Sequence, residues 1–363
     1  MKVGILTFHN ALNQGAVLQA YALQTYIEKK GHEVEFIDYR PEYRYSLKKD
    51  FLAKSLNVML FKWRNVYNGI KFTRRNDFPK VLHIGPVRYR SFQELKSNPP
   101  QYDLYICGSD QVWHFPQCLN PVYLMDFLPD GAKMISYAAS MGQHFPPQNA
   151  AGDLRKSLCR FEGLSLREDA GAEYVRHLFR GERDVSQDID PTLLISSAAY
   201  DNIAEQVTTP KRYIATYILS IMEPGHYDVI DAARRTLNAE VLNLRNPSTC
   251  SIVKGATNKI VTPYQWLSYI KNSVAVIAGS FHAVVFALIY HKPFVLIQPA
   301  SLRAAGGNRR VVSLLKPLGL SHHCVYDATD VEGLLKETID WEYVDRVISQ
   351  LAEQSKTYLN RYL

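Results

Sequence analysis

A strand–turn–helix–strand pattern between residues 274 and 298 constrains the fold of this chain more than any other segment. Apolar Val274 to Ile277 predict a buried strand that ends at Gly279. The apolar spacing then becomes helical, Lys292-Pro293 ends the helix, and Phe294 to Gln298 restarts a strand. Such a unit is typical of an open α/β sheet, in which ligands bind at the carboxyl ends of the strands.

Ser280 and His282 lie in the turn between this strand and this helix. The first N–H groups of a helix have no partner within it and form the positive end of the helix dipole, which favours a phosphate or carboxylate. A histidine there can bind an anion and transfer a proton. The alternative interpretation is that His282 caps its own helix and binds no ligand.

Length and composition indicate a globular protein of two domains. The 363 residues suit two domains of about 150–180 residues each. No apolar run reaches the roughly 18–20 residues needed to span a bilayer, and the segment Met1 to Thr7 lacks the apolar region of a signal peptide. We therefore expect a cytoplasmic protein.

Five scattered cysteines without a C-x-x-C pair favour neither disulfides nor a zinc ribbon, and Cys107 is expected to be a buried structural thiol.

A basic block occupies residues 40–90. It holds thirteen Lys or Arg and three acidic residues, a charge of +10, so that the rest of a chain of net charge +7 carries −3. One interpretation is a solvated helical insertion. The other is a surface for an anionic partner, such as a membrane face or a lipid-pyrophosphate acceptor, which would place the protein peripherally at the inner face of a membrane. No nucleic-acid-binding motif accompanies the charge, so nucleic acid is not an expected partner.

The order of predicted elements indicates two α/β series. The first begins with a strand at 3–8, a helix at 16–30 and a strand at 34–39, and continues with strands at 102–107, 133–138 and 163–166. Asp188 to Thr192 is predicted to be the hinge, and new strands follow at 213–219 and 240–244. We predict two doubly wound Rossmann-like domains facing a cleft, residues 1–190 and 191–340, as in the GT-B glycosyltransferases. A terminal helix, 341–363, is expected by analogy to pack back on the first domain.

Polar loops after the strands supply the first group of site candidates. The loop after the strand at 102–107 contains Ser109, Asp110 and Gln111. Asp110 is the best candidate for a general base, and its alternative role is to cap the turn that follows. In the first loop, Gly15 allows close approach of the backbone and Asn13 can hydrogen-bond a sugar hydroxyl, unless the pair simply forms the entry to a helix.

Arginines supply the second group. A guanidinium holds a carboxylate or phosphate through two parallel hydrogen bonds. Arg167 follows the strand at 163–166, and its alternative role is an ion pair with Glu168 or Asp169. Arg309, in an Asn-Arg-Arg turn, is expected to reach the cleft from the second domain. Asp190, before Pro191, is interpreted as a hinge residue that fixes a turn.

Metal and nucleotide motifs are lacking in this sequence. His322 and His323 are adjacent and do not share a helix face, so we do not expect them to chelate a metal. The sequence contains no H-E-x-x-H, no G-x-G-x-x-G after its first strand and no G-x-x-x-x-G-K-[ST]. We therefore predict no bound metal or cofactor.

Taken in chain order, these loops resemble the polysaccharide pyruvyl transferase family over nearly the whole chain. The motifs that carry the resemblance are Asn13 to Leu23, Gly108 to Trp113, Tyr137 to Gly142, Leu166-Arg167-Glu168, Asp190 to Leu194, Ser280-Phe281-His282 and the helix at Arg309. Gln14 and Ala283 depart from the family pattern, which commonly has an aromatic residue and a glycine there. The resemblance implies transfer of pyruvate from phosphoenolpyruvate to two hydroxyls of a sugar, forming a cyclic ketal in exopolysaccharide or capsule biosynthesis.

That reaction needs donors for two anions, an acid for C3 of the enol and a base for the sugar hydroxyls. We assign proton transfer to His282 and Asp110, and substrate binding to Asn13, Gly15, Ser109, Gln111, Arg167, Ser280 and Arg309. The acceptor is expected to be linked to a lipid or a nucleotide. Two alternatives stay open: a nucleotide-sugar glycosyltransferase of the same architecture, and a non-catalytic scaffold of a polysaccharide assembly complex.

Overall fold

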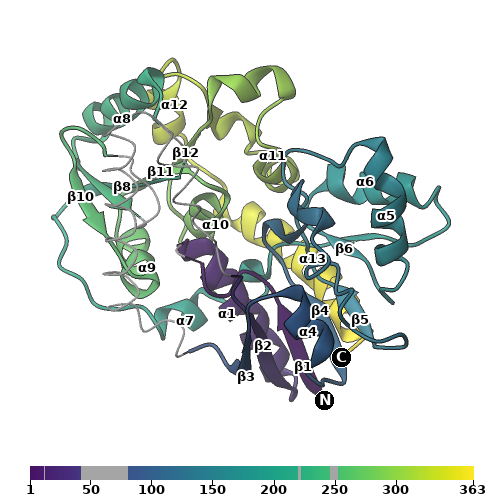
Figure 1. The fold of residues 1–363 in the computed structure, drawn as a ribbon. Helices are drawn as coiled ribbons and strands as arrows, with labels where there is room; N and C mark the ends of the chain where they lie inside the picture. The colour runs from purple at the N-terminus through teal and green to yellow at the C-terminus, as the bar shows by residue number, and fades with distance from the viewer. Residues whose placement is uncertain (12, 42–80, 220–221, 246–251) are drawn as a thin grey trace, which may run out of the picture.

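Two parallel β-sheets, each flanked by helices, organise the molecule (Figure 1). The structure is a computed structural model that describes residues 1–11, 13–41, 81–219, 222–245 and 252–363. Most of the basic block, residues 42–80, lies outside the described residues, so its expected helical or anion-binding character is not addressed there. Its last part is described and corrects the helical interpretation, because Ile84–Tyr89 form a strand that pairs in parallel with the strand at 33–39. In the described part of the chain, no helix is long and apolar enough to cross a membrane.

The first sheet has the strand order β3-β2-β1-β4-β5, and all of its pairs are parallel. Single bridges connect its last strand to a further parallel pair, β6 and β7. The two central strands, β1 and β4, are short, apolar and almost wholly buried, as is typical of parallel strands covered on both faces, whereas β3 at the edge is largely exposed. Their bounds are β1 (Lys2–Leu6), β2 (Glu33–Tyr39), β3 (Ile84–Tyr89), β4 (Leu104–Cys107), β5 (Met134–Ser136), β6 (Ser165–Leu166) and β7 (Ser186–Gln187).

The second sheet has the order β10-β9-β8-β11-β12-β13, again with parallel pairs. Its strands are β8 (Tyr213–Ile218), β9 (Glu240–Arg245), β10 (Thr257–Ile260), β11 (Ala275–Gly279), β12 (Phe294–Ile297) and β13 (Cys324–Val325). The predicted α/β architecture of two doubly wound sheets is therefore confirmed. The two sheets lie on either side of residue 190, while the domain boundaries at 190 and 340 stay predictions.

Both sheets reverse their strand order at one point, between β1 and β4 in the first and between β8 and β11 in the second. Ligands of open α/β sheets bind in the crevice outside the carboxyl ends of the strands at such a point. The loops after these four strands therefore mark where the structure is suited to bind substrates.

Local sequence explains where the helices begin. Asn13 caps α1 by accepting from the Gly15 N–H, and Thr262 and Gln265 form a reciprocal capping box on α9. The helices are α1 (Gln14–Lys29), α4 (Phe92–Ser97), α5 (Gln148–Leu158), α6 (Asp169–Leu178), α7 (Ser197–Asp201), α8 (Pro224–Leu237), α9 (Pro263–Lys271), α10 (Phe281–Ile289), α11 (Arg309–Leu315), α12 (Val331–Lys336) and α13 (Trp341–Asn360).

One apolar core joins the two halves. It includes Leu18 of α1, Trp266 of α9 and Phe286 of α10, all fully buried, and the Trp266 and Phe286 rings meet edge to face at 5.1 Å. This packing sets the loop after β1 close to the loop after β11, although the two are more than 260 residues apart in the chain.

The terminal helix α13 returns to the first sheet. In Figure 1 it runs from the second half toward β5, and the C-terminus lies near the N-terminus. The Tyr358 hydroxyl donates to the Ser136 carbonyl at 2.9 Å, and the Tyr26 hydroxyl donates to Asn360 at 3.0 Å. The helix thus fastens onto the strands and helix of the first half.

Candidate active site

A cavity of about 280 Å³ lies between the two sheets at the carboxyl ends of their strands. Asn13, Asp110 and Gln111 line it from the first half. From the second half come residues of the β11–α10 turn and of the region before α11, namely Gly279, Ser280, Phe281, His282, Gln298, Asn308 and Arg310. The cavity therefore brings together five of the nine predicted site residues: Asn13, Asp110, Gln111, Ser280 and His282.

The first turn of α10 faces this cavity. Ser280 is its N-cap, and the Ser280 hydroxyl accepts from the Ala283 N–H at 3.2 Å. No acidic residue lies in the first turn, and α10 is otherwise apolar and buried. The positive end of this helix is thus not compensated by its own side chains, which suits an anionic ligand.

His282 contacts a buried carboxylate. Its Nε2 atom lies 3.4 Å from Oδ2 of Asp190, a distance typical of an ion pair, and it makes no hydrogen bond within the described residues. The Asp190 side chain is fully buried. Its Oδ1 accepts from the N–H and hydroxyl of Thr192, while Ser109 donates to Oδ2 at 3.2 Å. One oxygen of Asp190 thus fixes the Pro191 turn, as predicted, and the other faces His282.

A buried arginine balances this carboxylate. Arg167 donates to Asp190 at 2.6 Å and to Glu168 at 3.1 Å, and its guanidinium lies 4.2 Å from the centre of the Phe281 ring. Burial by itself would raise the pKa of Asp190, but the positive charges of His282 and Arg167 and the hydrogen bonds to the carboxylate outweigh it and hold the pKa well below its usual range. Asp190 is therefore ionised beneath His282.

Arg310 is the guanidinium that lines the cavity. It donates to the side chain of Asn308 at 3.2 Å, and no carboxylate among the described residues lies within ion-pair distance of it. Burial, together with the neighbouring charge of Arg167, lowers the pKa of Arg310. A partly buried cation without a carboxylate partner is suited to bind an anion.

Asp110 has an unusual backbone. Its φ of 68° and ψ of −176° fall in a region that is almost confined to glycine, and such strain of about 1–3 kcal/mol is found most often at functional sites. The Asp110 side chain makes no capping bond to the turn Gln111–Trp113, which removes the alternative role considered from the sequence. Its carboxylate makes no hydrogen bond within the described residues, so it can accept one from a ligand.

Asn13 and Gly15 have structural roles at the cavity. Oδ1 of Asn13 accepts from the Gly15 N–H at 3.0 Å and from the Tyr217 hydroxyl at 3.3 Å, which is the alternative helix-entry role. A Cβ atom on Gly15 would lie 2.2 Å from the His282 ring. Glycine is therefore required because the start of α1 packs directly on the imidazole.

Besides Gly15, three predicted binding residues are absent from the lining of this cavity. Ser109 is fully buried behind it and donates to Asp190, and Arg167 is buried beneath the Phe281 ring. Arg309 points to the other side of its turn, where its guanidinium lies 4.8 Å from the Phe145 ring centre. The prediction is corrected for Ser109, which supports Asp190, and for Arg309, whose expected position is taken by Arg310. Arg167 also supports Asp190, and it lines a neighbouring cavity of about 300 Å³ together with Phe281 and Arg310.

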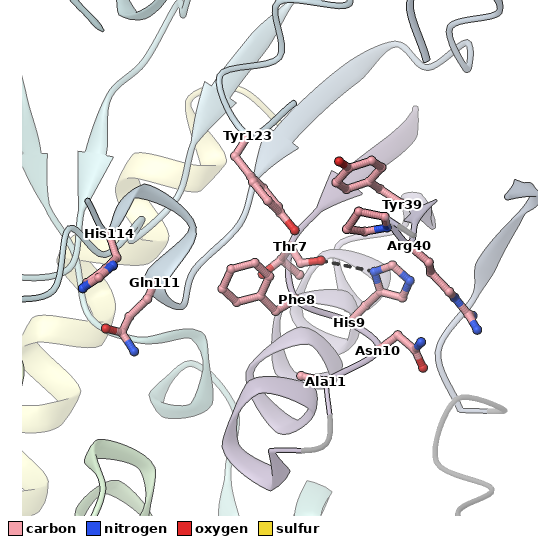
Figure 2. A pocket seen from close by; sticks show the side chains of 11 residues that line it. Thr7, Phe8, His9, Asn10, Ala11, Tyr39, Arg40, Gln111, His114 and Tyr123 are labelled. Atoms are coloured by element: carbon pink, nitrogen blue, oxygen red, sulfur yellow. Dashed lines mark hydrogen bonds between the residues drawn. The ribbon is translucent and has the colours of Figure 1, made fainter. Parts of the chain in front are cut away.

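A second cavity of about 630 Å³ opens at the carboxyl edge of the first sheet (Figure 2). Phe8, Tyr39 and Tyr123 give it aromatic walls, and the Phe8 and Tyr123 rings meet edge to face at 5.2 Å. Its polar lining is formed by His9, Asn10, Arg40, Gln111 and His114. Gln111 also lines the cavity between the sheets, so the two cavities meet at this residue.

A buried carboxylate also lies beneath the second cavity. Oδ1 of Asp38 accepts from Nε2 of His9 at 3.0 Å and from Arg40 at 2.5 Å, and Oδ2 accepts from Arg88 at 3.2 Å. Burial opposes ionisation, but the hydrogen bonds from His9 and Arg40 prevail and lower the pKa of Asp38 to about 2. The sequence analysis did not identify this group, because its members come from four separate positions in the first half.

Solved structures with a similar fold include UDP-N-acetylglucosamine 2-epimerases and a glucosyltransferase. The UDP-N-acetylglucosamine 2-epimerase from Rickettsia bellii aligns over 99% of this chain and 96% of its own, with a TM-score of 0.53 and 10% identity. A Methanocaldococcus jannaschii UDP-GlcNAc 2-epimerase in complex with UDP-GlcNAc and UDP aligns over 97% and 100%, with a TM-score of 0.50 and 11% identity. An alpha-glucosyltransferase in complex with UDP and DNA aligns over 99% and 95%, with a TM-score of 0.50 and 11% identity.

These likenesses, at such low identity, show the fold alone, and with the two sheets they define an α/β protein of GT-B-like architecture. A profile of the polysaccharide pyruvyl transferase family matches residues 13–301, which is most of the chain. The chain therefore belongs to the polysaccharide pyruvyl transferase family, a family of transferases. No curated protein sequence matches it significantly.

Proposed function

We propose that this protein is a ketal pyruvyltransferase, which transfers pyruvate from phosphoenolpyruvate to two hydroxyls of a sugar in surface-polysaccharide biosynthesis. The observation that carries the proposal is the convergence of Arg310, the first turn of α10, His282 and Asp110 on one small cavity. The cavity thus offers two anion-binding groups, Arg310 and the first turn of α10. It also offers two groups that can transfer protons, His282 and Asp110, and the reaction of a small enol phosphate needs both kinds.

The reaction adds a proton to C3 and two sugar oxygens to C2, and it breaks the bond from C2 to the phosphate oxygen and the O–H bonds of both hydroxyls. Protonation of C3 of phosphoenolpyruvate makes C2 electrophilic, and one sugar hydroxyl attacks C2. Phosphate leaves with cleavage of the C–O bond, and the second hydroxyl closes the ketal ring. Of the two protons that the hydroxyls lose, one replaces the proton given to C3 and the other ends on phosphate, so that no metal or redox cofactor is needed for the balance.

The residues of the cavity fit these steps. We assign the phosphate and carboxylate to Arg310 and the N-terminal turn of α10 with Ser280, and proton transfer to C3 to His282. The unpaired Asp110 carboxylate accepts the hydroxyl proton, since it lies on the side of the first sheet. Asp190 is a positioning residue, because its ionised carboxylate contacts the imidazole and orients it.

The sugar acceptor is assigned to the cavity of the first sheet. Aromatic rings provide apolar faces for a sugar ring, and the amide, guanidinium and imidazole groups around them provide hydrogen bonds to its hydroxyls. Since Gln111 borders both cavities, a sugar held there would present hydroxyls toward Asp110 and the donor. A lipid or nucleotide carrier for that sugar, and contact of residues 40–90 with an anionic membrane, are proposals that rest on the charge of the sequence.

The test is an assay of group transfer. The protein is incubated with phosphoenolpyruvate and a panel of lipid-linked or nitrophenyl sugars, and released phosphate and acceptor mass are measured. His282→Ala should lower the rate by about 10³-fold, within the range expected for loss of a general acid or base. His177→Ala, an exposed histidine bonded only to the Glu173 carbonyl, should keep the wild-type rate.

Two outcomes would overturn the proposal. Transfer from a nucleotide sugar in a parallel reaction, without phosphate release from phosphoenolpyruvate, would establish the nucleotide-sugar reaction suggested by the shared fold. Near wild-type transfer by His282→Ala would remove His282 from the chemistry even where the donor assignment holds.

A further inference from the structure

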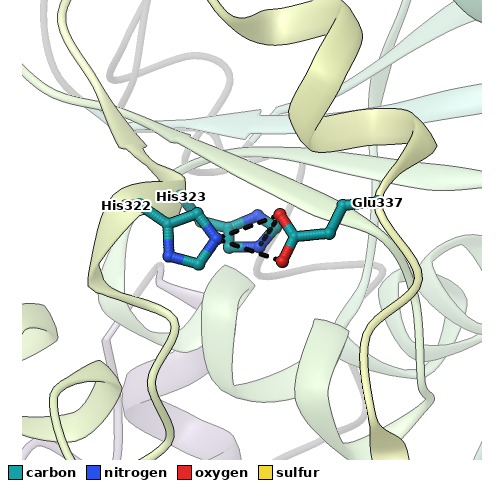
Figure 3. A group of neighbouring side chains, drawn as sticks. All are labelled: His322, His323 and Glu337. Carbon is teal, nitrogen blue, oxygen red and sulfur yellow. Dashed lines mark hydrogen bonds and ion pairs between the residues drawn. The ribbon is translucent and has the colours of Figure 1, made fainter.

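Two histidines and a glutamate converge far along the second half, away from the proposed active site. His322 and His323 lie in the short 3-10 turn Ser321–His323 that leads into β13, and Glu337 ends α12. Nε2 of His322 lies 3.0 Å from Oε2 of Glu337, and Nε2 of His323 lies 3.6 Å from the same oxygen. Figure 3 shows both rings directed at the carboxylate.

The hydrogen bond made by Nδ1 of His323 leaves the lone pair of its other ring nitrogen, Nε2, directed into this cluster. Its Nδ1 lies 2.8 Å from the Phe294 carbonyl, which can only accept, so the ring proton is on Nδ1. His323 is fully buried, and its Nε2 atom makes no hydrogen bond within the described residues. In the neutral ring this Nε2 is an acceptor that faces a carboxylate oxygen, which is also an acceptor.

An acceptor facing an acceptor calls for a cation between them. From these contacts we infer that His322, His323 and Glu337 form a binding site for Zn²⁺ or a similar divalent transition ion. The three ligand atoms all lie within 4.8 Å of one another. Ligands at about 2.0–2.1 Å from a tetrahedral zinc are separated by about 3.4 Å, so shifts of a few tenths of an ångström suffice for the two contacts described above.

The hydrogen bond to Phe294 has the form of an outer-shell contact. A histidine that binds a metal almost always donates its other N–H to a carbonyl or carboxylate, which fixes the tautomer and the ring orientation. His322 and Glu337 are partly exposed, so the ion would have water at its fourth position and a path to the solvent. Imidazole and carboxylate ligands favour zinc over calcium or magnesium.

The sequence analysis did not expect the two histidines to chelate a metal, and the present inference proposes that they do. They were expected to point apart, as adjacent residues of a helix do. In the 3-10 turn their rings lie 4.6 Å apart and reach one carboxylate, which is contributed by a residue fourteen positions beyond His323. Local spacing could not reveal this third ligand.

A metal bound at this site would stabilise the edge of the second sheet. β13 has only two residues, paired with Leu296 and Ile297 of β12. The carboxyl end of β12 leads to Gln298, which lines the active-site cavity and whose N–H donates to the Val325 carbonyl of β13. A metal joining the turn before β13 to the end of α12 would hold this edge in place. This role goes beyond the proposed transferase reaction and does not depend on it.

The test is zinc binding by the full chain, freed of any histidine tag and of metal by a chelator. After dialysis against ZnCl₂ and then metal-free buffer, we expect about one zinc per chain by elemental analysis, and a thermal midpoint several degrees above that of the metal-free protein. His322→Ala and Glu337→Gln, both at partly exposed positions, should lose this zinc and the rise in midpoint.

A matched control is His83→Ala, which removes an exposed histidine whose Nδ1 lies 2.7 Å from a carboxylate oxygen of Glu28. This pair joins a glutamate to one histidine instead of two. It should retain the zinc. The inference fails if the wild type retains no zinc, or if His322→Ala retains as much as the wild type. Cobalt in place of zinc provides a second readout, since visible absorption of a four-coordinate ion should be present in the wild type and His83→Ala and absent in Glu337→Gln.

Discussion

The two cavities occupy corresponding places in the two sheets but are built differently. Each lies near the point where strand order reverses, and beneath each a buried aspartate contacts a histidine: Asp190 with His282, and Asp38 with His9. The cavity between the sheets has about 280 Å³, and a fully buried arginine balances its aspartate. The cavity of the first sheet has about 630 Å³, aromatic walls and more exposed arginines.

This difference indicates that the two cavities are suited to different ligands. Buried charges and a helix N-terminus favour a small anion held tightly in one orientation. A wider aromatic cavity favours a larger, mostly neutral ligand such as a sugar. Substitutions on either side should therefore affect one substrate and spare the other, and the buried aspartates should differ in how strongly they stabilise the fold.

The largest effect is expected for Asp190→Asn. The substitution removes one of the two carboxylates that pair with the buried guanidinium of Arg167, so that only Glu168 remains. Removal of one partner from a buried ion pair destabilises the folded state by about 3–5 kcal/mol. Chemical denaturation monitored by fluorescence measures this loss, and transfer activity below the unfolding transition should also fall, because His282 loses its orienting carboxylate. A loss no larger than that of Asp38→Asn would contradict the distinction between the two sites.

Arg310→Met should raise the KM for phosphoenolpyruvate by about 10- to 100-fold, the effect of losing a hydrogen bond to a charged group, with little change in the KM for the sugar. Arg309→Met is the matched control. The Arg309 side chain stacks on Phe145 instead of lining the cavity, so its KM values should stay within about twofold of the wild type. The reverse result, with Arg309 the sensitive position, would reject the placement of Arg310. Initial-rate kinetics with both substrates varied separates the two cases.

Asp38→Asn should destabilise the protein by about 2 kcal/mol at neutral pH. The folded pKa of Asp38, about 2, is below its ordinary value of 3.8, so the carboxylate contributes stability above about pH 4 and loses that contribution as pH falls toward 2. The difference in unfolding free energy between wild type and variant should therefore shrink below about pH 4. Denaturation curves at pH 7, 4 and 3 measure it, and a constant difference would show that the ionised carboxylate is not its cause.

Phe8→Ala is expected to have the smallest effect. Loss of one aromatic face should raise the KM for the sugar acceptor by about fivefold, or about 1 kcal/mol, and leave the KM for phosphoenolpyruvate unchanged. An increase confined to the KM for phosphoenolpyruvate would place the donor in the aromatic cavity and reverse the assignment of the two sites.

Much of the fold followed from local pattern. The strand, turn and helix around Ser280 were predicted within one or two residues, since apolar periodicity is a local property. The helix is capped by Ser280, whereas the sequence analysis had considered His282 for that role. The predicted strands tend to be a little longer than the observed ones, because apolar residues continue past the last paired residue into buried loops, as at Tyr137 and Ala138.

The site was less predictable, since side-chain direction and distant partners decide it. Arg309 and Arg310 are consecutive, and adjacent residues at the start of a helix point about 100° apart, so the sequence could not choose between them. Asp190 was identified as a turn residue, and its first oxygen has that role. Its second oxygen faces His282, 92 positions away, through a fold that no local pattern describes.

The return of α13 to the first half has a consequence for how the chain is made. Tyr358 and Tyr362 fill the space beside Gly163, where a Cβ would lie 2.5 Å from the Tyr362 hydroxyl, and Tyr358 also bonds to β5. These groups lie far beyond the first half in the chain. A nascent chain holding only the first half would have uncovered apolar surface at β5 and Gly163, so this half can be completed only after α13 has been synthesised, in contrast to the usual order in which the first domain folds first.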